Sequence, residues 1–449
     1  MYLWIGGAHV QAADIVAKAG DVLRRYPLCD SCLGRLFGMR GYGLVNAERG
    51  RALKTLLLME AYDAVRSEWD EELLRALAAS GFEPARATLE RLKVEAPAKR
   101  ICYLCEGLVQ KIGELAKMCV EAGRKYEYET FQVGCMMPRE LMEREEELWT
   151  AYGLEASESL KSELTREVGK LVQKLTGKRY SPRKPDLLFI LDLKEWRVMV
   201  SARPLFIYGR YRKLVRGLPQ SPWPYPPNSR VLYTTSIEEL ITEPMVEAAG
   251  ARDAKLHAAG REDLDVRTLG SGRPFIVELK DPRVRSLDLR ALERMINDRA
   301  GGLIEVEGLK YVDGRLIPRL KAFAEIAKKT YVAIVRFERP VGDEELRMLE
   351  REMTNAVIRQ RTPLRVLGRR PDKVRRKVVY ELKAERLGER EAKLVITCQG
   401  GLYVKELIHG DEGRTQPSVA GLLNTKVEVV ELDVTWIEEP PFITELTSS

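Results

Sequence analysis

Histidine is scarce in this 449-residue chain, which contains only His9, His257 and His409. None of the three stands in a His-x-Glu setting near a Cys-x-x-Cys pair, so the sequence argues against the open catalytic metal shell of a zinc-dependent deaminase or hydrolase. A phosphate-cradling P-loop and a Rossmann glycine fingerprint are also missing. We therefore expect no nucleotide cofactor.

Long apolar runs are missing as well. No stretch approaches the roughly 20 residues of a membrane span, and the opening residues Met1–Trp4 lack a basic region followed by an apolar one. We expect a cytoplasmic protein with no membrane partner. Asn and Gln together number only thirteen among abundant Arg, Glu and Lys, a composition that leans toward hyperthermophiles.

The seven cysteines are an odd number in a chain without an apparent signal peptide, which argues against a disulfide scaffold. Four of them form two Cys-x-x-Cys pairs, Cys29 with Cys32 and Cys102 with Cys105. Two such turns can complete the tetrahedral thiolate shell that Zn²⁺ prefers. The roughly seventy intervening residues exceed the spacing of compact zinc modules, so on spacing alone a redox dithiol or unrelated buried thiols remain alternatives.

The length predicts two or three domains, because one hydrophobic core does not organise so many residues. A hydrophobic content of 45% with 31% charged residues is typical of a soluble globular protein. Five prolines between Gly217 and Ser229 predict a semi-rigid connector. We accordingly expect an N-terminal domain of residues 1–216, a linker of residues 217–229 and a C-terminal domain of residues 230–449.

Strand and helix patterns interleave in the second half of the chain. The spacing of Ser236 and Glu239 is that of a capping box and predicts the start of a helix. The predicted strands lie near residues 275–277, 303–306, 329–335, 394–397 and 427–436. We expect an α+β fold around a largely antiparallel mixed sheet.

Two segments are far more basic than the chain as a whole, whose net charge is only +7. Residues 210–216 are rich in basic side chains, with Tyr211 among them and Tyr208 just before, and residues 359–377 hold nine basic residues and one acid. Such density suits phosphate pairing and base stacking, although a charge run is more often a solvated face. The residues that we expect to contact a polyanion are Arg210, Arg212, Lys213, Arg361 and Arg365.

A charged, glycine-interrupted loop between two strands is predicted from His257 to Leu279. Its segment Gly260-Arg261-Glu262-Asp263 resembles the G-R-x-D motif of pseudouridine synthases, and the run from Gly260 to Glu278 is similar to the archaeal and eukaryotic tRNA pseudouridine-54/55 synthase family. A four-residue match alone is usually a solvated turn. The same family resemblance extends over nearly the whole chain.

Two later motifs carry the resemblance further. Lys329-Thr330-Tyr331 resembles the K-x-Y motif, whose tyrosine stacks on the target base and is implicated in proton removal. Residues 400–419 resemble the late motif, in which a basic residue pairs with the catalytic aspartate and an aliphatic residue packs beneath the base. By position these are Lys405 and Leu407, and the resemblance implies that Asp263 is the nucleophile.

The resemblance also implies the activity and architecture. It implies an isomerase, an intramolecular transferase, that converts uridines 54 and 55 in the TΨC arm of tRNA to pseudouridine without a catalytic cofactor, with Arg261 wedging into the space that the extruded uridine leaves. It implies a C-terminal pseudouridine-synthase fold, an N-terminal α/β accessory domain containing the RNA-binding THUMP module, and a structural Zn²⁺ on Cys29, Cys32, Cys102 and Cys105. The alternative is a non-catalytic tRNA-binding protein or RNA chaperone.

Overall fold

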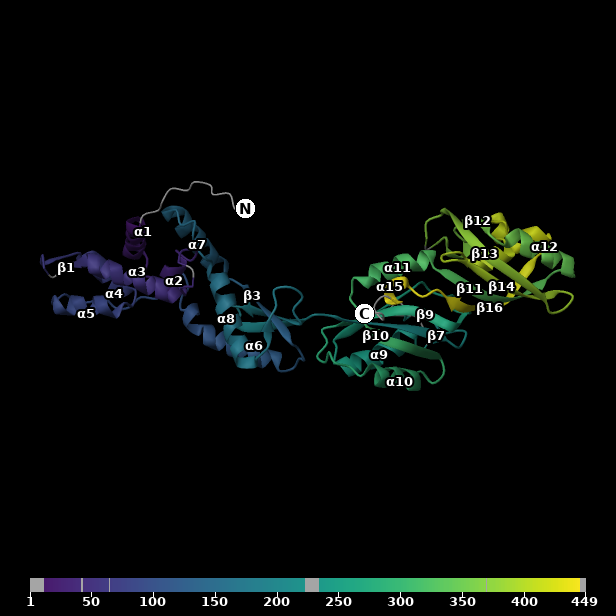
Figure 1. Ribbon diagram of the computed structural model, residues 1–449, viewed down its shortest axis with the longest axis horizontal. Coiled ribbons are helices and arrows are strands. Elements are labelled where there is room, and N and C mark those ends of the chain that lie inside the picture. The colour runs from purple at the N-terminus through teal and green to yellow at the C-terminus, as the bar shows by residue number, and fades with distance from the viewer. Residues whose placement is uncertain (1–11, 42, 64, 223–233, 369, 445–449) are drawn as a thin grey trace. The chain divides into compact units, whose positions relative to one another are not determined.

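The protein forms two compact units, Met1–Arg203 and Pro204–Ser449. The structure is a computed structural model that describes residues 12–41, 43–63, 65–222, 234–368 and 370–444 (Figure 1). Within these ranges no helix combines the length and the apolar character that crossing a bilayer requires.

The first unit begins with a helical part and continues with a small sheet covered by helices. The helical part comprises α1 (Ala12–Arg25), α2 (Asp30–Arg35), α3 (Asn46–Ala61), β1 (Tyr62–Asp63), β2 (Glu68–Trp69), α4 (Glu71–Ala79) and α5 (Glu83–Arg91). The second part comprises η1 (Leu108–Lys111), α6 (Ile112–Gly123), β3 (Thr130–Met136), α7 (Arg139–Tyr152), α8 (Leu160–Thr176), β4 (Arg179–Tyr180), β5 (Leu187–Asp192) and β6 (Arg197–Ala202). Its strands pair in the order β4-β3-β5-β6, so this part has the α/β character expected of the accessory domain.

The second unit interleaves strands and helices as the sequence predicts. Its elements are β7 (Leu205–Lys213), α9 (Ile237–Ala249), β8 (Asp253–Ala258), β9 (Arg267–Lys280), α10 (Leu289–Ala300), β10 (Ile304–Tyr311), α11 (Leu316–Ile326), β11 (Lys328–Phe337), α12 (Asp343–Met353), β12 (Ala356–Arg361), η2 (Leu364–Val366), β13 (Val374–Arg386), β14 (Glu391–Gln399), α13 (Val404–His409), η3 (Asp411–Gly413), β15 (Thr415–Gln416), α14 (Val419–Leu423), β16 (Val427–Ile437) and α15 (Pro441–Thr444). Helix α9 begins where predicted, because the Ser236 hydroxyl accepts the backbone N–H of Glu239 at 3.2 Å.

A ten-stranded sheet organises the second unit. Its order is β10-β7-β9-β16-β11-β14-β13-β12-β15, and β8 pairs with β9 beside this path. All described pairings are antiparallel except that of β9 with β16, which run parallel where Arg267 lies opposite Asp433. At that junction Gly270 has a φ of +53°, and an added Cβ would lie 1.9 Å from the Thr435 carbonyl oxygen. The expectation of a largely antiparallel mixed sheet is confirmed.

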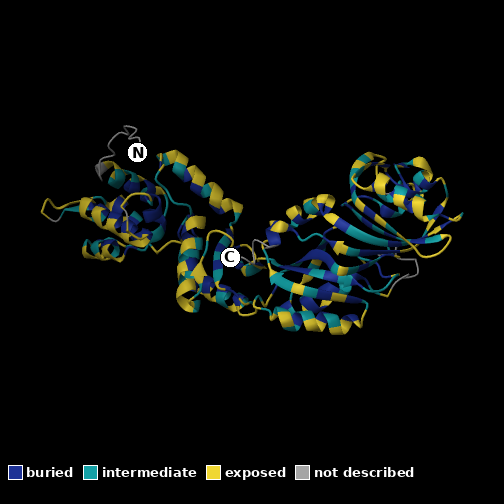
Figure 2. Ribbon diagram, turned by 45° about the vertical axis from the view of Figure 1, so that its right-hand side comes forward, coloured by how far each residue is buried: buried dark blue, intermediate teal, exposed yellow. Residues whose placement is uncertain are grey.

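Helices cover both faces of this sheet. Alternate residues of a strand face opposite sides, and accordingly Ile207 of β7 packs in a core with α9 and α10 whereas Tyr208 packs in another with α11 and α15. A third core joins β11, β13, β14 and β16 to α12, α13 and α14. Figure 2 shows the buried residues along the strands and exposed residues on the outer faces of the helices.

The boundary between the units corrects the domain limits predicted from the proline run. Strand β7, which we placed in the N-terminal domain, lies between β9 and β10 in the sheet of the second unit. Residues 217–229 also fall within the second unit, and residues 223–229 lie outside the described ranges. The Gly217 N–H bonds the Leu264 carbonyl at 2.8 Å, so the described start of the predicted linker is attached to the loop that bears Asp263.

Candidate active site

The loop of residues 259–266, between β8 and β9, carries the G-R-x-D segment. Gly260 has a φ of +85°, a conformation that L side chains rarely adopt. Its carbonyl accepts a hydrogen bond from the Gln220 side-chain amide at 3.0 Å, and the same amide bonds the Tyr211 hydroxyl at 2.8 Å. These contacts hold the turn that leads into Asp263.

Glu262 anchors this loop in the interior. Its carboxylate lies 2.8 Å from Arg273 Nε, with 1% and 2% of the two side chains exposed, although that N–H is not directed at the oxygen. The Tyr211 hydroxyl bonds the same carboxylate at 3.1 Å, and Arg273 Nη1 donates to the Ala259 carbonyl at 2.8 Å. Because Glu262 points inward, its neighbour Asp263 is free to face outward.

Cations from the end of β7 hold the loop backbone. The fully buried Lys213 donates from Nζ to the Leu264 carbonyl at 2.8 Å and approaches the Asp263 carbonyl at 3.3 Å. Arg216 donates to the Asp265 carbonyl at 2.7 Å. Burial lowers the pKa of Lys213, which nearby acids partly offset. These residues fix the position of the loop, a role that local charge density could not reveal.

Asp263 itself meets two cations. Arg365, which follows β12, places Nη1 3.1 Å from Asp263 Oδ1 and Nη2 3.0 Å from Oδ2. We call this two-point contact of the guanidinium with the carboxylate the fork. Lys405 of α13 lies 3.6 Å from Oδ2 but only 2.7 Å from both oxygens of Asp265. The Asp263 side chain is 36% exposed, so the carboxylate is paired with two cations and still accessible.

Tyr331 and Lys329 of β11 border the same site. Burial raises the pKa of Tyr331, and the carboxylates of Glu262 and Asp263 raise it further, whereas Arg273 opposes them. Burial lowers the pKa of Lys329 to about 7, and Arg273 lowers it too. A Cβ on Gly260 would lie 3.3 Å from Lys329 Nζ, which places this buried amine against the turn of the loop.

The remaining predicted site residues differ in their surroundings. Arg210 is 12% exposed, pairs with Glu439 and donates to the Ile437 carbonyl at 2.8 Å. Arg212 pairs with Glu305 at 2.9 Å and with a second acid of β10. We expected Arg210 and Lys213 to form part of an exposed basic edge. Instead, both donate hydrogen bonds to carbonyl groups of the protein itself.

The structure also describes three further residues that we predicted to contact the substrate. Leu407 has no exposed surface and packs in the core beneath α13. Arg261 is exposed and makes no ion pair within the described ranges. Arg361 lies on β12 with its side chain 53% exposed and 2.7 Å from Asp372.

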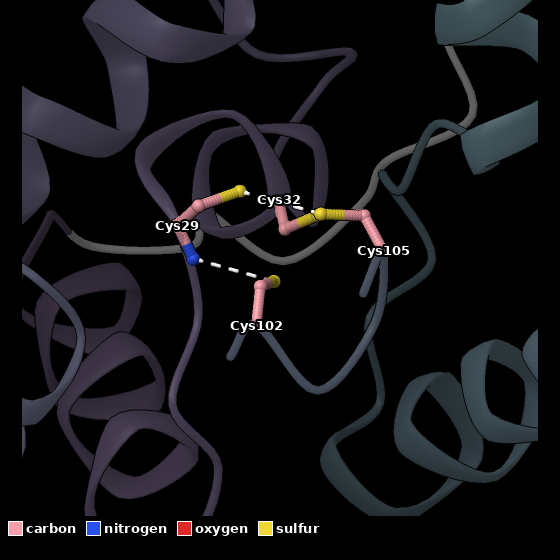
Figure 3. A group of neighbouring side chains, drawn as sticks. All are labelled: Cys29, Cys32, Cys102 and Cys105. Carbon is pink, nitrogen blue, oxygen red and sulfur yellow. Dashed lines mark hydrogen bonds between the residues drawn. The ribbon is translucent and has the colours of Figure 1, made fainter. Parts of the chain in front are cut away.

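Four cysteines gather in the first unit. The sulfur atoms of Cys29, Cys32, Cys102 and Cys105 all lie within 4.8 Å of one another (Figure 3), and those of Cys29 and Cys105 are 3.8 Å apart. Tetrahedral Zn²⁺ with Zn–S bonds of about 2.3 Å requires sulfur separations of roughly 3.8 Å. The two pairs, far apart in sequence, can therefore hold one metal ion.

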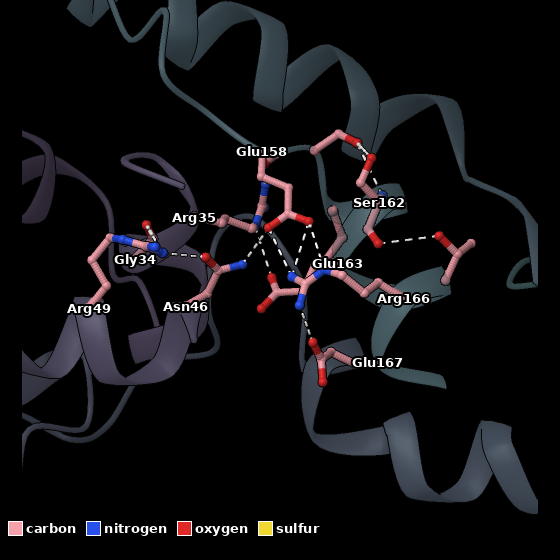
Figure 4. Close-up of polar contacts among 12 residues, drawn as sticks. Gly34, Arg35, Asn46, Arg49, Glu158, Ser162, Glu163, Arg166 and Glu167 are labelled. Carbon is pink, nitrogen blue, oxygen red and sulfur yellow. Dashed lines mark hydrogen bonds and ion pairs between the residues drawn. The ribbon is translucent and has the colours of Figure 1, made fainter. Parts of the chain in front are cut away.

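A buried network of charges lies next to this cluster. Arg35, on the same helix as Cys32, is fully buried and pairs with Glu145 of α7, while its Nε lies 3.7 Å from Glu163 of α8. Burial raises the pKa of Glu163 to about 7. The Asn46 amide donates to Glu158 at 2.7 Å (Figure 4). The network joins α2, which bears Cys32, and α3 to α7 and α8.

The α+β sheet and a carboxylate set between two cations, together with the partly buried Tyr331 of β11, identify the second unit as a pseudouridine-synthase domain. The family model described as "Pus10, C-terminal" matches residues 206–438, and "Pus10 THUMP domain, archaeal" matches residues 115–192. The chain belongs to the tRNA pseudouridine synthase Pus10 family.

Relatives of this family match more than nine tenths of the chain. The protein named "tRNA pseudouridine synthase Pus10" from Thermofilum pendens is 54% identical over 93% of this chain and 94% of its own length. That of Methanothrix thermoacetophila is 44% identical over 94% of each, and that of Methanopyrus kandleri 42% identical over 94% of this chain and 98% of its own. The solved structure titled "Crystal Structure of a Cbf5-Nop10-Gar1 Complex" covers 44% of each chain at a TM-score of 0.27 and 18% identity, and we draw nothing from that likeness.

Proposed function

We propose that this protein, an isomerase of the tRNA pseudouridine synthase class, converts uridines 54 and 55 in the TΨC arm of tRNA to pseudouridine with Asp263 as nucleophile. The observation that carries the proposal is the Asp263 carboxylate, which is partly exposed on a loop held from beneath and is flanked by Arg365 and Lys405. A nucleophilic carboxylate needs a fixed position and an exposed oxygen, and the anchored loop and the partial exposure of Asp263 provide both.

The reaction breaks the N1–C1′ bond of uridine, turns the base and joins C5 to C1′, after which C5 loses its proton and N1 gains one. Asp263 provides an oxygen for the covalent or electrostatic stage of this sequence, and Lys405 balances its charge. The charge of Asp263 contributes to the raised pKa of Tyr331. Tyr331 is the residue that we assign to contact the base. No step requires a redox group or a nucleotide, and all atoms of the substrate are retained in the product.

Recognition requires that the target base leave its stack. The exposed Arg261 immediately precedes Glu262 and Asp263, and we assign it to fill the space that the base vacates. Arg361 lies at the end of β12 with its side chain 53% exposed, and Arg375, Arg376 and Lys377 lie on β13, which pairs with β12. We propose that they contact tRNA phosphates in the cytoplasm.

We further propose that the four-cysteine cluster holds a structural Zn²⁺. The sulfur separations suit a tetrahedral ion, and four thiolates leave no open position for a reacting molecule. In this role the metal would stabilise the first unit, which contains the THUMP match, and would take no part in bond making.

The test is to incubate an unmodified tRNA transcript with the protein and map pseudouridine chemically at each position. Asp263→Asn should abolish product while the tRNA dissociation constant stays within about threefold. Asp265→Asn, which removes the other carboxylate paired with Lys405, is the matched control and should keep at least about a tenth of the activity.

Two outcomes would contradict the proposal. Pseudouridine formation by Asp263→Asn at the wild-type rate would exclude Asp263 as nucleophile. Absence of product with the wild type, together with tight tRNA binding, would favour a non-catalytic tRNA-binding protein.

A further inference from the structure

Arg365 contacts both carboxylate oxygens of Asp263 in the free protein. The two fork contacts of 3.1 and 3.0 Å occupy Oδ1 and Oδ2 together. An oxygen that attacks or stabilises a ribose carbon needs an accessible lone pair. If the fork opens at one oxygen, the lone pair that now faces Arg365 becomes available to the ribose, in addition to the part of the carboxylate that is already exposed.

A second acceptor for the same guanidinium already exists. Arg365 Nε donates to Glu406 Oε1 at 2.6 Å, and the Glu406 side chain is 1% exposed. The other oxygen, Oε2, is buried and has no hydrogen-bond partner within the described ranges. A buried carboxylate oxygen without a donor is costly. A second N–H group of Arg365 would satisfy Oε2 if the guanidinium moved fully onto Glu406.

The surroundings allow such a transfer. The guanidinium carbon lies 5.7 Å from the centre of the Tyr403 ring, within the range of a cation–π contact, and 40% of the Arg365 side chain is exposed. Lys405 remains 3.6 Å from Asp263, so the carboxylate would keep a cationic partner after Arg365 leaves. The short η2 segment that bears Arg365 lies within the basic run that we assign to tRNA, which could supply the driving contacts.

We propose that Arg365 is a positioning residue that leaves Asp263 for Glu406 when a ribose enters the site. The inference rests on the proposed function of Asp263. Arg365 thus keeps the nucleophile paired in the free enzyme and releases it in the complex, and Glu406 acts through Arg365 without touching substrate.

The rival interpretation makes the fork a permanent support that orients Asp263 throughout the reaction. The two interpretations predict opposite behaviour in a double-mutant cycle. If Glu406 accepts Arg365, its loss harms the enzyme only while Arg365 is present. If the fork is permanent, removing Arg365 adds to any defect.

The experiment measures single-turnover pseudouridine formation at saturating tRNA for the wild type, Glu406→Gln, Arg365→Gln and the double variant, with exposed Arg351→Gln of α12 as the control. Glu406→Gln should slow the reaction about tenfold or more and leave the tRNA dissociation constant within about threefold. The double variant should be at least about threefold faster than Glu406→Gln alone. Arg365→Lys, which keeps the charge but cannot fork a carboxylate, should also reduce the Glu406→Gln defect.

Each outcome decides the question. A double variant as slow as or slower than Glu406→Gln, or a Glu406→Gln enzyme at the wild-type rate, overturns the transfer. If Glu406→Gln does not fold, as judged by its thermal melt, Glu406→Asp keeps the charge and withdraws it from Arg365, and the same rescue by Arg365→Gln is required. An active Asp263→Asn enzyme would instead remove the proposed function itself, so the two failures are distinct.

Discussion

Glu262→Gln should destabilise the second unit far more than its conservative chemistry suggests. The change leaves Arg273 as an uncompensated charge with only 2% of its side chain exposed, a situation that costs about 3–5 kcal/mol. Tyr211 loses its charged acceptor as well. Replacing both ionic partners, in Glu262→Met with Arg273→Met, should cost less than the single change, since no charge is then left buried.

The matched control is the exposed pair of Asp253 and Lys280, which has the same 2.8 Å separation but side chains 55% and 34% exposed. Asp253→Asn should cost less than about 1 kcal/mol. Urea unfolding followed by hydrogen-exchange mass spectrometry of β9 peptides reports the second unit separately. Equal losses for Glu262→Gln and Asp253→Asn would refute the reasoning, because burial would then not determine the cost.

Three further predictions concern titration, metal and backbone. Lys329 has a folded pKa of about 7, below its unfolded value of about 10.4, so wild-type stability should rise by up to about 1.4 kcal/mol per pH unit between pH 7 and 10, and Lys329→Met should lack this rise in pH-dependent urea unfolding. Removing metal with a chelator should lower the melting temperature of the first unit and spare the second in calorimetry. Gly270→Ala, whose Cβ would lie 1.9 Å from the Thr435 carbonyl oxygen, should cost well over the roughly 1 kcal/mol expected at Gly301, where φ is also positive but space is open.

Local signals in the sequence were sufficient for much of the second unit. Period-two strands and the Ser236 cap concern residues close together in the chain, and the observed elements follow them. The motif resemblance singled out Asp263 and Lys405, which lie 3.6 Å apart in the structure, and Tyr331, whose pKa Asp263 helps to raise.

The internal pairing of residues 210–216 could not be predicted from their charge density. Charge density is a local property, whereas the partners of these cations lie far downstream, at Glu305 for Arg212 and at Glu439 for Arg210. A basic run that pairs internally and one that faces solvent look alike in sequence. For the same reason Arg365 was expected only as a phosphate ligand, since its fork on Asp263 depends on a turn formed a hundred residues earlier.

The position of β7 determines where the gene can be divided. An open reading frame that starts at residue 217 would remove an interior strand, leave the neighbouring edges of β9 and β10 unpaired and deprive the loop of Lys213. One that starts at residue 204 would retain every strand of the large sheet. Autonomous expression of the C-terminal half should therefore succeed from the upstream junction and yield insoluble material from the proline-rich one.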